Sequence, residues 1–164
     1  MGGWWAGKVR QFRRHLVGRV APAERKALAG WLTPFQLALF EGMHRADQRH
    51  GLDVVASLRA AGHDDEDLLI AGLLHDAGKG PGIGLWHRVA WSLGERYGGR
   101  VTRGAQRLPG FAAAFERIGQ HAQRSADLAQ EVGCTPRTVE LIRNQAKPLD
   151  ALHGEALRLA DEAN

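Results

Sequence analysis

The stretch Leu68–Gly80 constrains the fold more than any other part of the chain. It begins with an unbroken run of apolar and small residues up to Leu74, and His75 and Asp76 follow at once. Burying a neighbouring imidazole and carboxylate is costly unless they are paired or bound to a metal. The stretch therefore predicts a buried helix that ends at a candidate metal site.

The length and composition are typical of one globular domain. The chain has 164 residues, 44% hydrophobic and 24% charged, which is enough apolar material for a real core. Its longest apolar run, Leu68–Leu74, is much shorter than the roughly 20 residues that a membrane-spanning helix needs. Cys134 is the only cysteine, so no intrachain disulfide can form. These features predict a cytoplasmic protein, because cysteines stay reduced in that compartment.

The positive charge of the chain is concentrated near its N-terminus. The formal net charge is +4, yet residues 1–30 carry seven Lys or Arg residues against Glu24 alone. Residues 4–20 predict a basic amphipathic helix, since aromatic and aliphatic side chains recur there at helical spacing. This arm packs on the domain with its charges in water, or its residues 8–26 contact an anionic membrane or a nucleic acid. We therefore divide the chain into an arm, 1–30, and a main domain, 31–164.

The remainder of the chain predicts helices that are separated by short connections. Thr33-Pro34 and Thr135-Pro136 each combine a capping residue with a proline at the first helical position. No segment alternates apolar and polar residues with the β-branched enrichment of a strand. The expected fold class is all-α. The expected helices run over 22–31, 34–61, 65–77, 85–98, 109–119, 121–132, 136–147 and about 150–163.

Three of the eight histidines, His50, His75 and His121, fall on apolar helix faces. Asp76 adjoins one of them, and Asp161 lies on the last helix among small and apolar residues. Such histidines are either core members with hydrogen-bond partners or ligands of a shared cation. Two imidazoles and two carboxylates form a mixed nitrogen and oxygen set that suits Mn, Fe, Co, Ni, Zn or Mg.

Three segments resemble the H…HD…D signature of the HD superfamily of metal-dependent phosphohydrolases. They are Gln48–Val54 around His50, Leu73–Lys79 around His75 and Asp76, and Leu159–Glu162 around Asp161. The likeness covers about residues 36–164, and the LLHDxGK segment is its most specific part. It implies an HD-domain helical bundle in which one divalent metal is bound by His50, His75, Asp76 and Asp161. It also implies hydrolysis of a phosphomonoester or phosphodiester, often in a nucleotide.

Many HD proteins bind a second metal through two further histidines between the HD pair and the last aspartate. His121, followed by Ser125-Ala126, resembles the first of these positions. Asn144 and Gln145 stand where the second histidine is expected, and an amide ligates only weakly through its oxygen. The resemblance therefore implies one metal and leaves the second site open.

The resemblance also implies roles for the residues around the metal. Asp76 accepts the proton of the attacking water, Lys79 neutralises charge on the phosphoryl oxygens, and His121 or His87 protonates the leaving oxygen. The expected catalytic residues are Asp76, Lys79 and His121. A small phosphorylated substrate is bound by Lys79, His87, Arg88 and Arg124. The alternative is a non-catalytic or regulatory HD-domain protein that keeps the one-metal site, or only the fold, as a metal or nucleotide sensor or as a scaffold.

Overall fold

The computed structural model describes residues 18–80 and 82–164, and every regular element in these ranges is helical. The all-α fold class is therefore confirmed for this part of the chain. None of its helices is both long and apolar enough to cross a membrane. Most of the helix expected over residues 4–20 and most of the arm over 1–30 lie outside the described residues, and residues 18–20 are not helical.

Ten α-helices and one 3-10 helix are found within the described residues. The first five elements are α2 (Pro22–Ala29), α3 (Pro34–Gly42), α4 (Arg45–Ala60), α5 (Glu66–Leu74) and the 3-10 helix η1 (Ala77–Lys79). The remaining six are α6 (Leu85–Tyr97), α7 (Gly99–Ala105), α8 (Phe111–Gly119), α9 (His121–Glu131), α10 (Pro136–Arg143) and α11 (His153–Ala163).

Side-chain caps explain where two of these helices begin. The Thr33 hydroxyl accepts a hydrogen bond from the Gln36 N–H, and the Gln36 side chain accepts one from the Thr33 N–H. This reciprocal capping box precedes α3. Thr135 caps α10 by accepting from the Thr138 N–H at 3.1 Å. Both helix starts agree with the prediction from the sequence.

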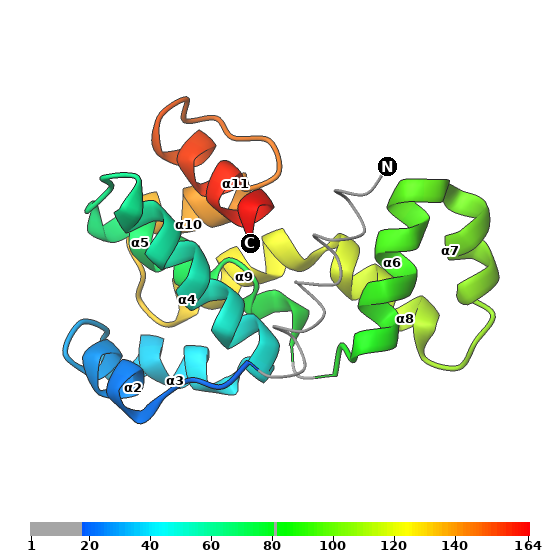
Figure 1. Cartoon of the computed structure of the whole chain (residues 1–164), viewed down its shortest axis with the longest axis horizontal. Coiled ribbons are helices and arrows are strands. Elements are labelled where there is room, and N and C mark those ends of the chain that lie inside the picture. The colour runs from blue at the N-terminus through cyan, green and yellow to red at the C-terminus, as the bar shows by residue number, and fades with distance from the viewer. Residues whose placement is uncertain (1–17, 81) are drawn as a thin grey trace.

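Most helices surround one apolar core, and every residue of the Leu68–Leu74 run in α5 is buried in it. Helices α4, α10 and α11 pack on α5, while α9 packs on α10 and η1 (Figure 1). The α4–α5 crossing is close because Gly51 has no side chain: a Cβ there would lie 2.5 Å from the carbonyl oxygen of Leu73. This close approach brings His50, the residue before Gly51, beside the end of α5.

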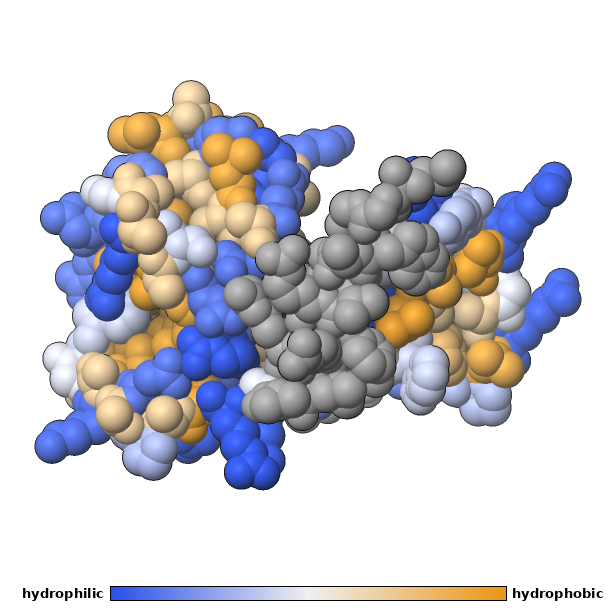
Figure 2. Space-filling model, in the orientation of Figure 1, coloured by the Kyte–Doolittle hydropathy of each residue, from blue (hydrophilic) through white to orange (hydrophobic). Residues whose placement is uncertain are grey.

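Helices α6, α7 and α8 form a lobe that projects from this body (Figure 1). The lobe has a small core of its own around Ile83, Phe115 and Ile118. Hydrophilic side chains project from its outer edge (Figure 2). Arg88 of α6 anchors the lobe to α4 through two hydrogen bonds of 2.6 Å to the buried carboxylate of Asp47.

The helix expected over 34–61 is in fact two helices, α3 and α4. Met43 adopts an extended backbone with ψ of 156°, and Nδ1 of His44 accepts a hydrogen bond from an N–H in the first turn of α4. The Gln48 side chain donates to the carbonyls of Glu41 and Met43 and so satisfies backbone groups at the break. Because the apolar periodicity continues across the break, the sequence pattern merges the two helices.

Two further details differ from the expectation. Asp65, not Asp64, caps α5, because its carboxylate accepts from the Leu68 N–H at 2.9 Å. Helix α7 was not expected at all. It buries no residue and therefore lacks the apolar stripe by which helices are found in a sequence.

Candidate metal centre

Four side chains from four segments meet beside the C-terminal end of α5. His50 comes from α4, His75 from the C-cap of α5, Asp76 from the start of η1, and Asp161 from α11. Ligand atoms of His50, His75 and Asp76 all lie within 4.8 Å of one another. Asp161 Oδ1 lies 2.7 Å from His50 Nε2 and 3.4 Å from His75 Nε2. The structure therefore brings the four predicted metal ligands together; we call them the HHDD cluster.

His75 turns its Nε2 atom toward the rest of the cluster. Its Nδ1 donates to the carbonyl of Gly72 at 2.9 Å, which leaves Nε2 as the ring nitrogen that faces the cluster. His75 is 1% exposed, and its Nε2 is buried without a hydrogen-bond partner among the described residues. A buried polar atom without a partner costs free energy. A cation held by this atom would remove that cost.

The charges of the cluster control its protonation. Burial by itself would lower the pKa of His75, but the carboxylates of Asp76 and Asp161 raise it to about 9. Burial also opposes ionisation of Asp76, yet Lys79 and His75 hold the pKa of that carboxyl well below its ordinary range. The pKa of Asp161 is likewise lowered against the effect of burial, by its hydrogen bond with His50 and by the neighbouring ring of His75. The ionised carboxylates therefore supply negative charge that stabilises a bound cation.

Two more groups reach Asp76. Its Oδ2 accepts from Lys79 Nζ at 2.5 Å, and its Oδ1 lies 3.6 Å from Nε2 of His121. Nδ1 of His121 donates to the carbonyl of Ile118 at 2.5 Å, which leaves Nε2 facing Asp76. Burial lowers the pKa of His121 although Asp76 opposes the effect, so this ring is neutral at pH 7. The three residues expected to act in catalysis are thus neighbours.

Tight packing of η1 on α9 holds His121 near Asp76. The Gly78 N–H donates to the buried hydroxyl of Ser125 at 2.8 Å. A Cβ at Gly78 would lie 2.5 Å from the carbonyl oxygen of His121 and 2.6 Å from the amide nitrogen of Ser125. No larger residue fits there unless one backbone moves. Sequence reasoning missed this pair, although a glycine two residues after Asp76 was the available signal.

The amides at the position of the expected second histidine bind backbone groups. The buried Gln145 side chain donates to the carbonyls of His75 at 3.1 Å and Ile142 at 3.0 Å. The Asn144 side chain donates to the carbonyl of Glu140 at 3.1 Å. Gln145 therefore fixes the backbone of a candidate ligand, a role that the sequence did not reveal.

The four residues expected to bind substrate lie in different surroundings. Within the described residues, Lys79 is the one that contacts a member of the HHDD cluster. Arg88 is committed to the ion pair that anchors its lobe, and the His87 ring packs on Phe111 with 4.6 Å between centroids. Arg124 lines a pocket beside η1. The substrate role of all four residues stays a prediction.

Comparison with known proteins gives no independent guide to the function of this site. A scan against protein-family models, a search of curated proteins and a search of solved structures each found no match. Function is therefore inferred from the arrangement of the residues.

Proposed function

We propose that this protein is an HD-type metal-dependent phosphohydrolase that acts on a phosphomonoester or phosphodiester, with nucleotides as the expected substrate class. One observation carries the proposal: the buried Nε2 of His75 has no hydrogen-bond partner among residues 18–80 and 82–164, and it lies among His50, Asp76 and Asp161. Ordinary core histidines are hydrogen-bonded at their buried polar atoms. This arrangement supports Nε2 of His75 as a metal ligand.

The donor set fits a divalent cation. Two imidazole nitrogens and two carboxylates suit Mn, Fe, Co, Ni, Zn and Mg, and the donors do not choose among these metals. Buttressing contacts hold the ligands in place, as is usual around metal sites. For His75 these contacts are the carbonyl of Gly72 on its ring and the Gln145 amide on its backbone.

Hydrolysis would need a Lewis acid, a positive charge near the phosphoryl oxygens and a proton acceptor. A divalent cation bound by the HHDD cluster supplies Lewis acidity, which polarises a phosphoryl oxygen and acidifies water. Lys79 adds positive charge beside Asp76, where charge develops on the phosphoryl oxygens. The lowered pKa of Asp76 makes it a weak base and suits it to ligation. Neutral His121, with its Nε2 facing Asp76, is the better proton acceptor, and we assign it that role rather than the donor role expected from the sequence.

Metal analysis and an activity screen of the purified full chain test this function. The wild type is expected to contain a divalent metal and to hydrolyse at least one nucleotide or model phosphoester. His75→Ala is expected to lose both the metal and the activity. His63→Ala, which alters a half-buried histidine outside the cluster, serves as the matched control and should retain both. Turnover by metal-free His75→Ala would falsify the mechanism.

A metal-binding sensor or scaffold is the second candidate function. The observation that favours it is the position of Gln145, whose side chain holds the His75 carbonyl instead of offering a second imidazole to the site. A protein with one tightly bound metal and no turnover on phosphomonoesters, phosphodiesters or nucleotides would support this alternative over hydrolysis.

A further inference from the structure

A pocket of about 340 Å³ lies between the Ala77–Gly80 turn and one face of α9. No member of the HHDD cluster lines it, and neither does Lys79 or His121. The pocket therefore shares the turn with the candidate metal centre but presents a different set of side chains. Its volume is at the lower end of the range for small-molecule sites.

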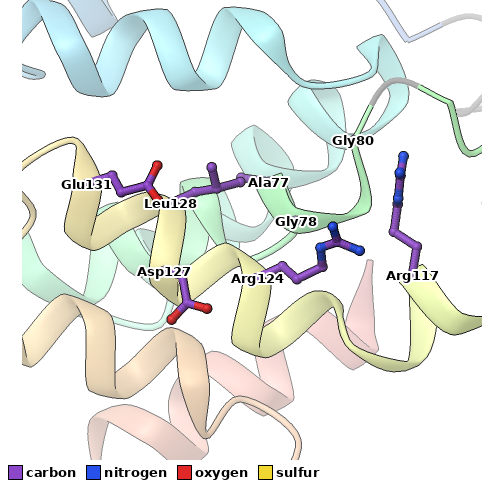
Figure 3. Close-up of a pocket in the computed structure, with 8 residues that line it drawn as sticks. All are labelled: Ala77, Gly78, Gly80, Arg117, Arg124, Asp127, Leu128 and Glu131. Carbon is purple, nitrogen blue, oxygen red and sulfur yellow. The ribbon is translucent and has the colours of Figure 1, made fainter.

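Two arginines define one end of the pocket. The side chains of Arg117 from α8 and Arg124 from α9 both extend toward the glycine turn at Gly80 (Figure 3). Nη1 of Arg117 lies 3.5 Å from the point that a Cβ of Gly80 would occupy, so the guanidinium rests against bare backbone. Neither guanidinium makes a hydrogen bond or an ion pair within the described part of the chain.

The half-buried guanidinium of Arg117 and the exposed guanidinium of Arg124 are both open to an anionic ligand. Guanidinium groups form short, strong and often bidentate hydrogen bonds with carboxylates and phosphates. The carboxylates of the pocket lie toward its other end, away from Arg117 (Figure 3). Two neighbouring positive charges at a concave wall raise the local concentration of anions. The first end of the pocket is therefore suited to an anionic group such as a phosphate.

The other end of the pocket accepts hydrogen bonds. Asp127 and Glu131 lie one turn apart on α9, and Leu128 lines the wall beside them. Asp127 already accepts from Gln123 at 2.7 Å and lies 3.6 Å from Arg143. Glu131 has no partner among the described residues. This end is suited to hydroxyl or amino donors.

We propose that this pocket binds a small phosphorylated molecule that also carries hydroxyl or amino groups. Its phosphate lies on Arg117 and Arg124, and its donors reach Glu131 and Asp127. The site does not depend on a cation in the HHDD cluster, because none of the cluster's side chains lines it. The pocket and the candidate metal centre are connected by the Ala77–Gly80 turn, because this turn lines the pocket and directly follows Asp76 of the cluster.

Calorimetric titration of the chelator-treated full chain tests the proposal, with ribose 5-phosphate and inorganic phosphate as probes. Ribose 5-phosphate is expected to bind more tightly than phosphate, because it reaches both ends of the pocket. Arg117→Gln and Arg124→Gln should each weaken binding of both probes about tenfold, the usual effect of losing a charge-assisted hydrogen bond. Glu131→Gln should weaken ribose 5-phosphate and leave inorganic phosphate unchanged.

Two controls separate this site from the metal centre. Arg107→Gln removes an exposed arginine that does not line the pocket and should leave binding unchanged. His75→Ala should also retain ribose 5-phosphate binding, whatever its effect on hydrolysis. Absence of binding to the wild type overturns the proposal. So does binding that is lost in His75→Ala but kept in both pocket arginine variants.

Discussion

At the scale of single residues, the site depends on two glycines that let backbones touch. Gly51 allows α4 to approach α5 and places His50 beside His75, whose ring centroids lie 5.1 Å apart. Gly78 allows η1 to lie on α9 and places Asp76 near His121. The distances between the polar side chains of the site therefore depend on Gly51 and Gly78, which let neighbouring backbones come close.

Gly78→Ala is expected to destabilise the protein by about 1–3 kcal/mol, the usual cost of forcing an extra group into a packed interior. The new Cβ would meet backbone atoms of His121 and Ser125 at 2.5 and 2.6 Å, and backbone cannot rotate away. Urea unfolding monitored by circular dichroism measures the effect. Gly104→Ala is the matched control, since a Cβ on that helical residue meets nothing within 4 Å. Equal stability of the two variants would show that η1 and α9 are not tightly packed.

The thiol of Cys134 is expected to be a poor nucleophile. Burial raises its pKa, although the hydrogen bond from the Gln36 amide partly opposes this. A raised pKa means less thiolate at pH 8, and the thiolate is the reactive form. Alkylation by iodoacetamide should therefore be slower than for the urea-unfolded chain and should still increase as the pH rises above 9. Equal rates for folded and unfolded protein at pH 8 would contradict the environment seen around this thiol.

At the scale of elements, a buried ion pair ties the α6–α8 lobe to α4, while α8 also contacts α9 and η1. Asp47 of α4 is 2% exposed, and both of its oxygens accept from Arg88 of α6 at 2.6 Å. Arg88 also donates to the Ile83 carbonyl at the base of the lobe. The pair therefore links the small core of the lobe to the helix that carries His50.

Arg88→Met is expected to cost about 3 kcal/mol, because removing one partner leaves the Asp47 carboxylate buried and uncompensated. Urea unfolding of the single variants and of the Asp47→Asn/Arg88→Met double variant forms the cycle that isolates the pair. The double variant should be more stable than Arg88→Met, since it removes the stranded charge. A double variant that is less stable than both single variants would contradict the assignment of this cost to a buried charge.

Most helices could be predicted from the sequence because their signals are local. Thr33 and Thr135 indicate helix starts, because each caps its helix through a hydrogen bond to a residue three positions later. The break at Met43–His44 could not be predicted, because it is stabilised by Gln48 reaching back to carbonyls across the break. Helix α7 left no pattern because it buries nothing.

The same distinction holds for the site at the scale of the whole molecule. His50, His75, Asp76 and Asp161 were found by their order along the chain and by their likeness to one signature. Contacts between distant segments carry no such signal. One example is the hydrogen bond from the Gln145 amide to the His75 carbonyl, and another is the ion pair of Arg88 with Asp47. The residues next to these four in the sequence give no sign of either contact. Arg124 was expected to bind substrate, but its position beside Arg117 in the pocket could not be predicted for the same reason.

A bound cation should stabilise the entire fold, because its ligands come from α4, α5, η1 and α11. A ligand that binds only the folded state adds about 2.7 kcal/mol when its free concentration is 100 times its Kd. For a chain of this size that corresponds to a rise in Tm of roughly 5–10 °C. Scanning calorimetry of chelator-treated protein with added Mn²⁺ or Zn²⁺ measures the shift.

Two variants test whether the rise in Tm comes from metal binding at the HHDD cluster. Asp161→Asn should reduce the rise in Tm, because it removes an anionic ligand that reaches the site from α11, the segment most distant from His50 in the sequence. His63→Ala should keep the full shift, since that histidine lies outside the cluster. The comparison uses the difference between chelated and metal-loaded protein within each variant, so that a change in the stability of the metal-free fold does not affect it. An equal rise in Tm for Asp161→Asn and wild type would mean that the stabilising cation binds elsewhere, and the HHDD cluster would then have to be explained as a network of core ion pairs.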